Sequence, residues 1–197
     1  MKILAFSDLH HNRARADVLV TESAQADLVI GAGDFCNHRK GLPEAMNLMS
    51  GLGAPMLAVP GNAESDVELQ DAAHVGTTVL HGTGVESHSL RFFGIGGATP
   101  VTPFGHWSWD LTESEAEAVL ARCEAVDVLI SHSPPKGAVD VTSKGVSIGS
   151  EALRAAIERL HPALVLCGHV HDCWGQEARI GASRVVNLGP APHWFEL

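Results

Sequence analysis

Short apolar segments recur along the chain, and each one ends in a cluster of small or polar residues. Five of them show no polar alternation, which predicts buried strands of a largely parallel sheet. These strands cover residues 2–6, 26–30, 55–59, 127–130 and 163–167. Two other segments, 76–97 and 174–188, combine alternation with glycine and β-branched residues, and they predict hairpin-type strands.

Helical patterns lie between the strands. Thr112 and Glu115 are spaced as a capping box, and apolar residues follow them at intervals of three and four. The same apolar spacing follows Ser150. Residues 13–25 and 43–52 are two further candidate helices. Strands that alternate with helices predict an α/β fold with a mixed sheet system, parallel in its middle and antiparallel toward the later strands.

Length and charge narrow the class of protein. A chain of 197 residues with 45% hydrophobic residues predicts one domain, 1–197, with a substantial core. The net charge of −10 makes long nucleic acid a poor partner, because such binding rests on basic groups. No apolar run approaches the roughly 18 residues of a membrane helix or forms a secretory leader, so we expect a cytoplasmic protein without a membrane partner. Four cysteines without paired spacing predict reduced thiols. The oligomeric state stays open.

Side chains that bind metals follow the carboxyl ends of the five buried strands. They are Asp8 and His10 after the first strand, Asp34 after the second, Asn62 after the third, His132 after the fourth, and His169 and His171 after the fifth. Ligands of α/β sheets bind outside the carboxyl ends of strands, so we expect these side chains to converge. Each motif alone is usually a turn or a solvated histidine, and it is their coincidence that favours a metal site.

The residue types indicate which metals would bind. Carboxylate, amide and imidazole donors without a thiolate suit manganese, iron, cobalt or zinc better than calcium or magnesium. Asp8 and His10, like His169 and His171, are two residues apart, which in extended backbone points both side chains to one side. Seven ligands are too many for one tetrahedral ion. Two ions that share a bridging carboxylate would account for them.

The ordered motifs D-x-H, G-D, G-N, S-H and G-H-x-H resemble those of the calcineurin-like metallophosphoesterase superfamily, from residue 4 to about residue 190. SHSPP at 131–135 and the late VVNLGP segment are similar to the small prokaryotic phosphoesterases and phosphodiesterases of that superfamily. The resemblance implies a four-layer α/β/β/α sandwich with two mixed sheets, and a small phosphorylated substrate. It implies two divalent transition-metal ions, manganese first and iron, zinc, cobalt or nickel as alternatives, whose bridging hydroxide attacks the phosphate ester. It assigns Asp8, His10, Asp34 and His171 to one ion, and Asp34, Asn62, His132 and His169 to the other.

One position departs from the family pattern. Residues 61–64 read Gly-Asn-Ala-Glu, so Ala63 stands where most catalytic members carry a histidine that contacts the phosphate and protonates the leaving group. His11 and His38 are candidate catalytic helpers in its place. Some family members without this histidine still cleave activated diesters, so the departure favours a phosphodiester substrate. The alternative is a binding module of the same fold that is weakly catalytic or not catalytic.

Other residues near the motifs carry weaker signals. The loop 100–110 contains Trp107 and Trp109, which either cover a substrate or pack on the core. Lys136 and Arg13 follow two of the motifs and are candidates to pair with phosphate, although basic loop residues are usually only solvated.

Overall fold

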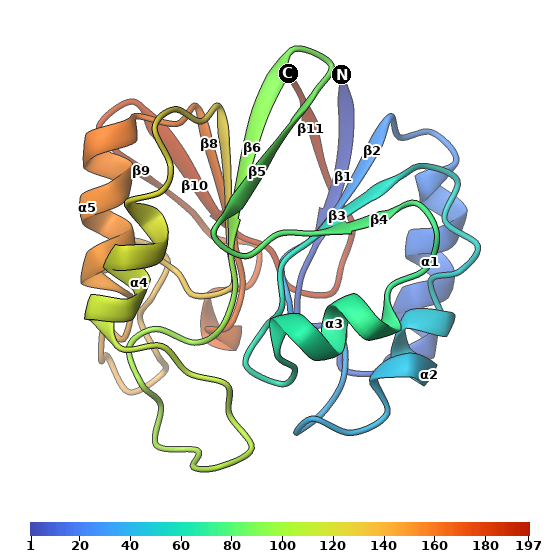
Figure 1. Ribbon diagram of the computed structural model, residues 1–197, viewed down its shortest axis with the longest axis horizontal. Coiled ribbons are helices and arrows are strands. Elements are labelled where there is room, and N and C mark those ends of the chain that lie inside the picture. Colours follow the sequence, from blue (N-terminus) through green and yellow to red (C-terminus); the bar gives the residue numbers. More distant parts are fainter.

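Two β-sheets lie face to face between two layers of helices in the computed structural model, which describes residues 1–197 (Figure 1). The first sheet has the order β11-β1-β2-β3-β4 and the second the order β5-β6-β7-β8-β10-β9. The first contains β1 (Lys2–Phe6), β2 (Leu28–Gly31), β3 (Met56–Ala58), β4 (Thr77–Val79) and β11 (His193–Glu196). The second contains β5 (Thr83–Ser87), β6 (Leu90–Ile95), β7 (Val128–Ser131), β8 (Leu164–Cys167), β9 (Glu177–Ile180) and β10 (Ser183–Asn187). Both sheets are parallel inside, and β11, β5 and β9 pair antiparallel at the edges. The mixed sheets are therefore confirmed.

Five helices flank the sheets. They are α1 (Arg13–Ser23), α2 (Leu42–Asn47), α3 (Asp66–Ala72), α4 (Glu113–Leu120) and α5 (Glu151–Leu160). Figure 1 shows α1 and α2 on the outer side of the first sheet and α4 and α5 on the outer side of the second. Three separate buried clusters fill the spaces between the layers: one between the two sheets and one beneath each helical layer. Three cores between successive layers make the four-layer α/β/β/α sandwich.

Side-chain caps explain where several helices begin. The Thr112 hydroxyl accepts a hydrogen bond from the backbone N–H of Glu115 and forms the predicted capping box. The Ser150 hydroxyl caps α5 by accepting a hydrogen bond from the backbone N–H of Leu153. Helix α2 ends at Asn47 rather than at residue 52. Helix α3 was not predicted, although Ser65 and Glu68 form the same capping box in front of it. The spacing of these two residues in the sequence could have predicted the start of this helix.

The hairpin interpretation of 76–97 was partly wrong. The segment divides between the sheets: β4 pairs parallel to β3 in the first, whereas β5 and β6 form an antiparallel hairpin in the second. The segment 174–188 does form an antiparallel pair, β9 with β10. Strand β11 was not predicted, and it lies antiparallel to β1. The two chain ends consequently lie side by side in Figure 1.

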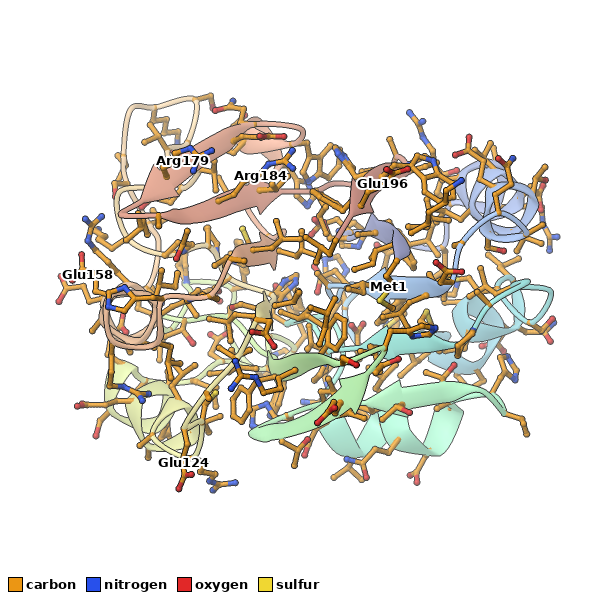
Figure 2. The ribbon with its side chains drawn as sticks, turned by 90° about the horizontal axis from the view of Figure 1, so that it is seen from above. Met1, Glu124, Glu158, Arg179, Arg184 and Glu196 are labelled. Atoms are coloured by element: carbon orange, nitrogen blue, oxygen red, sulfur yellow. The ribbon has the colours of Figure 1, made fainter.

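Figure 2 shows the molecule from the end that carries the two chain ends, with Glu158 of α5 at the left edge and Arg179 and Arg184 on the β9–β10 hairpin. Strand β1 begins at this end, and the strands parallel to it run away from the viewer. All four cysteines are buried and free. The longest helix has 11 residues, and none is long and apolar enough to cross a membrane. The cytoplasmic location stays a prediction.

Candidate metal centre

The seven predicted ligands come together at one end of the molecule, from two sheets rather than from one. The first sheet carries Asp8, Asp34 and Asn62 just beyond β1, β2 and β3, whereas the second carries His132 and His169 just beyond β7 and β8. The remaining ligands, His10 and His171, approach each other across the boundary between the sheets. Because the two sheets end side by side, ligands from both face a common space.

A first group of donor atoms surrounds the Nε2 atoms of two histidines. His10 Nε2 lies 3.4 Å from His171 Nε2 and 3.5 Å from Asp34 Oδ2. His171 Nε2 lies 3.6 Å from Asp8 Oδ1. Nitrogen and carboxylate oxygen atoms gathered at this spacing can share one cation, and Asp8, His10 and His171 form a compact group of potential ligands.

A second group lies on the other side of Asp34. His132 Nε2 is 3.4 Å from Asp34 Oδ1 and 3.1 Å from Asn62 Oδ1. The same amide oxygen is 3.0 Å from His169 Nδ1. Asp34 therefore places one carboxylate oxygen against each group, Oδ2 toward His10 and Oδ1 toward His132.

Hydrogen bonds outside the site orient the imidazole and amide ligands. His10 Nδ1 lies 3.0 Å from the carbonyl oxygen of Cys36, and His132 Nδ1 lies 2.8 Å from that of Ala32. A ring whose Nδ1–H donates to a carbonyl has its Nε2 lone pair free for a metal. The Nδ2 of Asn62 donates to Ser108 Oγ at 3.0 Å, which turns Oδ1 toward the histidines. The donor set therefore fits divalent transition metals.

Asp8 is buried and receives several hydrogen bonds. The Ser7 hydroxyl donates to Asp8 Oδ2 at 2.5 Å, the indole N–H of Trp174 donates to the same oxygen at 3.1 Å, and the backbone N–H of His169 donates to Oδ1 at 3.1 Å. Burial acts to raise the pKa of Asp8, but hydrogen bonding with His171 and the charge of His132 hold the pKa below its usual range. The ring of Trp174 also lies against that of His171, with 4.3 Å between the centroids. Sequence reasoning missed Trp174, which touches two of the ligands.

Asp34 lies on a tight turn held by Glu64. Glu64 is fully buried, and its carboxylate accepts hydrogen bonds from the backbone N–H groups of Asp34 and Gly61 at 2.8 Å each and of Phe35 at 3.3 Å. Burial and then the charge of Asp34 raise the pKa of Glu64 to about 7. A Cβ atom on Gly61 would collide with Asp34, so only glycine fits there. Glu64 stands two residues after Asn62, but the spacing alone did not show its role.

The ligand pairs do not use extended backbone, so that part of the prediction was wrong. Asp8 and His10 have φ angles of 52° and 46°, and His169 has a φ of 67°, all in the left-handed region. Asp34 also lies there, with a φ of 57°. Non-glycine residues rarely adopt this conformation, and such strain concentrates at functional sites. The ligands converge because of tight turns and not because of strand alternation.

The pKa values of two neighbouring histidines in the second group are shifted in opposite directions. Burial acts to lower the pKa of His132, but the charges of Asp34 and Asp8 raise it above the usual value. Burial and the charge of His132 lower the pKa of His169 to about 4. The charges of the two aspartates therefore favour a proton on His132. A metal ion must compete with this proton, so metal affinity depends on pH.

A cavity of about 640 Å³ opens over the ligands. Of the two candidate helpers, His38 lines it and meets the ring of Trp107, with 4.3 Å between centroids. His11 does not line the cavity, and its Nε2 lies 3.0 Å from the carbonyl oxygen of Lys40. Ala63 is buried within the core beneath the first helical layer, so its side chain does not face the cavity.

The two basic candidates do not reach the cavity lining either. Lys136 donates to the carbonyl oxygen of Ser147 at 2.8 Å, and Arg13 begins helix α1. No lysine or arginine lines the cavity. The ligands and their neighbours are thus the only source of strong electrostatic recognition there.

Comparisons with known proteins identify the family of this chain. Residues 1–196 match the family model of the calcineurin-like phosphoesterase superfamily domain. A UPF0046 protein of Caenorhabditis elegans is 30% identical over 89% of this chain and 65% of its own length. The human metallophosphoesterase domain-containing protein 1 is 33% identical over 50% of this chain and 31% of its own. The chain thus spans less than two thirds of these relatives.

Solved structures share the fold at low sequence identity. TT1561 of Thermus thermophilus superposes with a TM-score of 0.75 at 20% identity, covering 95% of this chain and 88% of that one. A dimetal phosphatase from Danio rerio superposes with a TM-score of 0.61 at 13% identity, covering 96% of this chain and 88% of that one. These likenesses show the shared fold, and the family match over residues 1–196 shows that the chain belongs to the calcineurin-like phosphoesterase superfamily.

Proposed function

We propose that the chain hydrolyses a phosphodiester of small size at a site that binds two divalent transition-metal ions. The observation that carries this proposal is the placement of Asp34. Its two carboxylate oxygens lie 3.5 Å from His10 Nε2 and 3.4 Å from His132 Nε2, in two different groups of donor atoms. A carboxylate between two such groups is the arrangement that a bridged pair of ions needs.

The residues assigned to the ions follow the two groups of donor atoms. One ion would be held by Asp8, His10, Asp34 and His171, and the other by Asp34, Asn62, His132 and His169. Such ions supply positive charge for the phosphate and lower the pKa of water. The chain itself fixes the donor atoms through Glu64, Ser108 and Trp174, so little reorganisation is needed when the substrate binds. Manganese is our first choice of metal because the donors combine oxygen and nitrogen.

The charge of the cavity favours a diester over a monoester. A monoester carries up to two negative charges near neutral pH, whereas a diester carries one. The lining holds no lysine or arginine that would balance the second charge, and Asp172 adds a carboxylate at the side. In addition, Ala63 is buried and supplies no proton to a leaving group. Outside the seven ligands the titratable side chains of the lining are His38 and Asp172, and we choose His38 as the group that would protonate a leaving oxygen.

A substrate panel tests the proposal. Metal-free protein is reconstituted with manganese and assayed against phosphate monoesters, diesters and cyclic diesters. We expect turnover of diesters, and loss of that turnover in His132→Ala but not in His88→Ala, a histidine on the exposed β5–β6 turn. Monoesters cleaved faster than all diesters would contradict the choice of substrate.

A binding module is the second candidate function. Ala63, which is buried, stands where the family pattern has the histidine that protonates the leaving group, so this position supplies no proton donor. This candidate predicts metal binding without turnover of any ester. Metal-loaded protein that hydrolyses none of the panel with manganese, iron, zinc or cobalt would favour it.

A further inference from the structure

The cavity above the metal ligands has an aromatic wall, defined by Phe104 and Trp107 of the loop 100–110. The two rings stack, with an interplanar angle of 13° and 5.3 Å between centroids. Both residues line the cavity, and Phe104 is 49% exposed. A large apolar side chain that stays half exposed beside polar ligands contributes little to the core, which is typical of a binding surface.

The aromatic wall is tied to the metal centre through Asn62. The carbonyl oxygen of Asn62 accepts a hydrogen bond from the backbone N–H of Trp109 at 2.9 Å, and its side chain donates to Ser108. Ser108 donates in turn to Asp110 at 2.5 Å. The loop that carries the two rings is therefore anchored to a ligand on both its main chain and its side chain. A group bound against the rings would therefore have a defined position relative to Asn62 and the other ligands.

The remaining lining restricts the charge of such a group. Thr142 and Ile148 of another loop also line the cavity, and Ile148 is partly exposed. Outside the ligands the lining contains one carboxylate, that of Asp172, and no lysine or arginine. A second phosphate or a carboxylate on the bound group would find no lysine or arginine to pair with, and it would be repelled by the carboxylate of Asp172. An uncharged group avoids this cost.

From these observations we propose that the aromatic wall binds one ester group of the substrate, and that this group is a flat, uncharged ring. The inference rests on the proposed function, since it concerns the same site. Flat rings gain from stacking on aromatic side chains, beyond the effect of burying apolar area. A cavity of about 640 Å³ has room for a ring together with the phosphate. Phe104 and Trp107 are then residues that determine specificity and do not touch the reacting bonds.

Binding of two phosphonates tests the inference without relying on hydrolysis. Phenylphosphonate and methylphosphonate carry the same anionic head, and only the first has a ring. We expect manganese-loaded protein to bind phenylphosphonate about 3- to 10-fold more tightly, as measured by titration calorimetry. Phe104→Ala and Trp107→Ala should each reduce that preference and leave the affinity for methylphosphonate unchanged.

Three further arms separate stacking from other effects. Phe104→Leu keeps apolar bulk without a flat ring, so it should lose most of the preference. Trp194→Ala removes an exposed aromatic residue of β11, far from the lining, and should change neither affinity. 4-Carboxyphenylphosphonate should bind more weakly than phenylphosphonate because its carboxylate has no cation to meet.

The outcomes also distinguish this inference from the proposed function. Equal binding of the two phosphonates by the wild type, or a preference that survives both alanine substitutions, would overturn the inference. If diesters are hydrolysed in that case, the proposed function still stands. Protein that binds neither phosphonate and hydrolyses no ester would contradict both.

Discussion

The floor, by which we mean the seven metal-ligand candidates at the base of the cavity, is held much more firmly than the aromatic wall. Five of the seven line the cavity itself, namely His10, Asp34, Asn62, His169 and His171. On the floor, Asp8 is 1% exposed and receives three hydrogen bonds, and His132 is fully buried with its ring fixed by a carbonyl. On the wall, Phe104 is 49% exposed, and its ring stacks on that of Trp107. The floor has strained backbone at several ligands, whereas the wall lies on a loop whose residues 103–106 are exposed.

This difference separates two kinds of function within one cavity. Preorganised donors on the floor determine which metals bind and which bond is broken. Exposed rings on the wall select what is attached to the phosphate, and they can be replaced without disturbing the donors. Substitutions on the floor should therefore affect metal binding and all substrates, whereas substitutions on the wall should affect some substrates only.

Metal removal should have the largest effect, because the floor has no function without its ions. After dialysis against a chelator we expect hydrolysis to fall by at least about 10³-fold, and manganese to restore it. Calcium should restore little, since histidine nitrogen is a poor ligand for a hard cation. Steady-state assays on the same preparation measure hydrolysis before dialysis, after dialysis and after each metal is added. Full activity in excess chelator would refute a metal-dependent floor.

His38→Ala should have the next largest effect, and a selective one. His38 lines the cavity beside Trp107, so we expect it to protonate the leaving oxygen of the substrate. Its loss should slow diesters with poor leaving groups by roughly 10²-fold and leave activated aryl diesters nearly unchanged. His11→Ala is the matched control, because His11 lies outside the cavity lining. An equal loss for all leaving groups would remove His38 from this role.

Trp174→Phe should weaken the floor more gently. The substitution keeps a ring beside His171 but removes the N–H that donates to Asp8. Loss of a hydrogen bond to a ligand commonly lowers metal affinity by about 10- to 100-fold, and the partial exposure of Trp174 places our expectation near tenfold. Competition with a metal-sensitive dye measures it, and Trp194→Phe should behave as the wild type. Unchanged affinity would show that the Trp174 hydrogen bond does not orient Asp8.

Ala63→His should act on stability rather than on catalysis. Ala63 is 1% exposed and packed in the core, so a larger polar ring there would overpack it and bury a polar group. We expect a loss of about 1–3 kcal/mol in the free energy of unfolding, measured by urea denaturation. A stable variant that accelerates esters with poor leaving groups would show instead that the new imidazole reaches the cavity.

The sequence predicted the floor better than the wall for a physical reason. Buried strands that end in polar residues leave a clear pattern, and the ends of parallel strands converge whatever the details of the turns. The seven ligands were found in this way, although the left-handed turns that aim Asp8 and His169 left no simple pattern. The division of the strands between two sheets came from the family resemblance and not from the hydrophobic pattern.

Contacts between loops that are far apart in the chain could not be predicted from the sequence. Trp174 lies 166 residues from Asp8, and no local spacing links the two side chains. Sequence analysis assigned Phe104 no role and left Trp107 undecided between packing and substrate contact, because exposure depends on the path of the whole loop. It could not separate His11 from His38 either, since each stands near a ligand in the chain and only the fold places one in the cavity. Helix α3 could have been predicted, since the capping box of Ser65 and Glu68 is visible in the sequence.

The metal content of Asp34→Asn tests the central claim most directly. Asp34 directs one oxygen to each group of donor atoms, so both ions depend on it. We predict about two manganese ions per wild-type chain by elemental analysis, and the same in the control Asp17→Asn on the exposed side of α1. Asp34→Asn should lose both ions while remaining folded by circular dichroism. One ion fully kept in Asp34→Asn, with the other lost, would contradict a shared bridge.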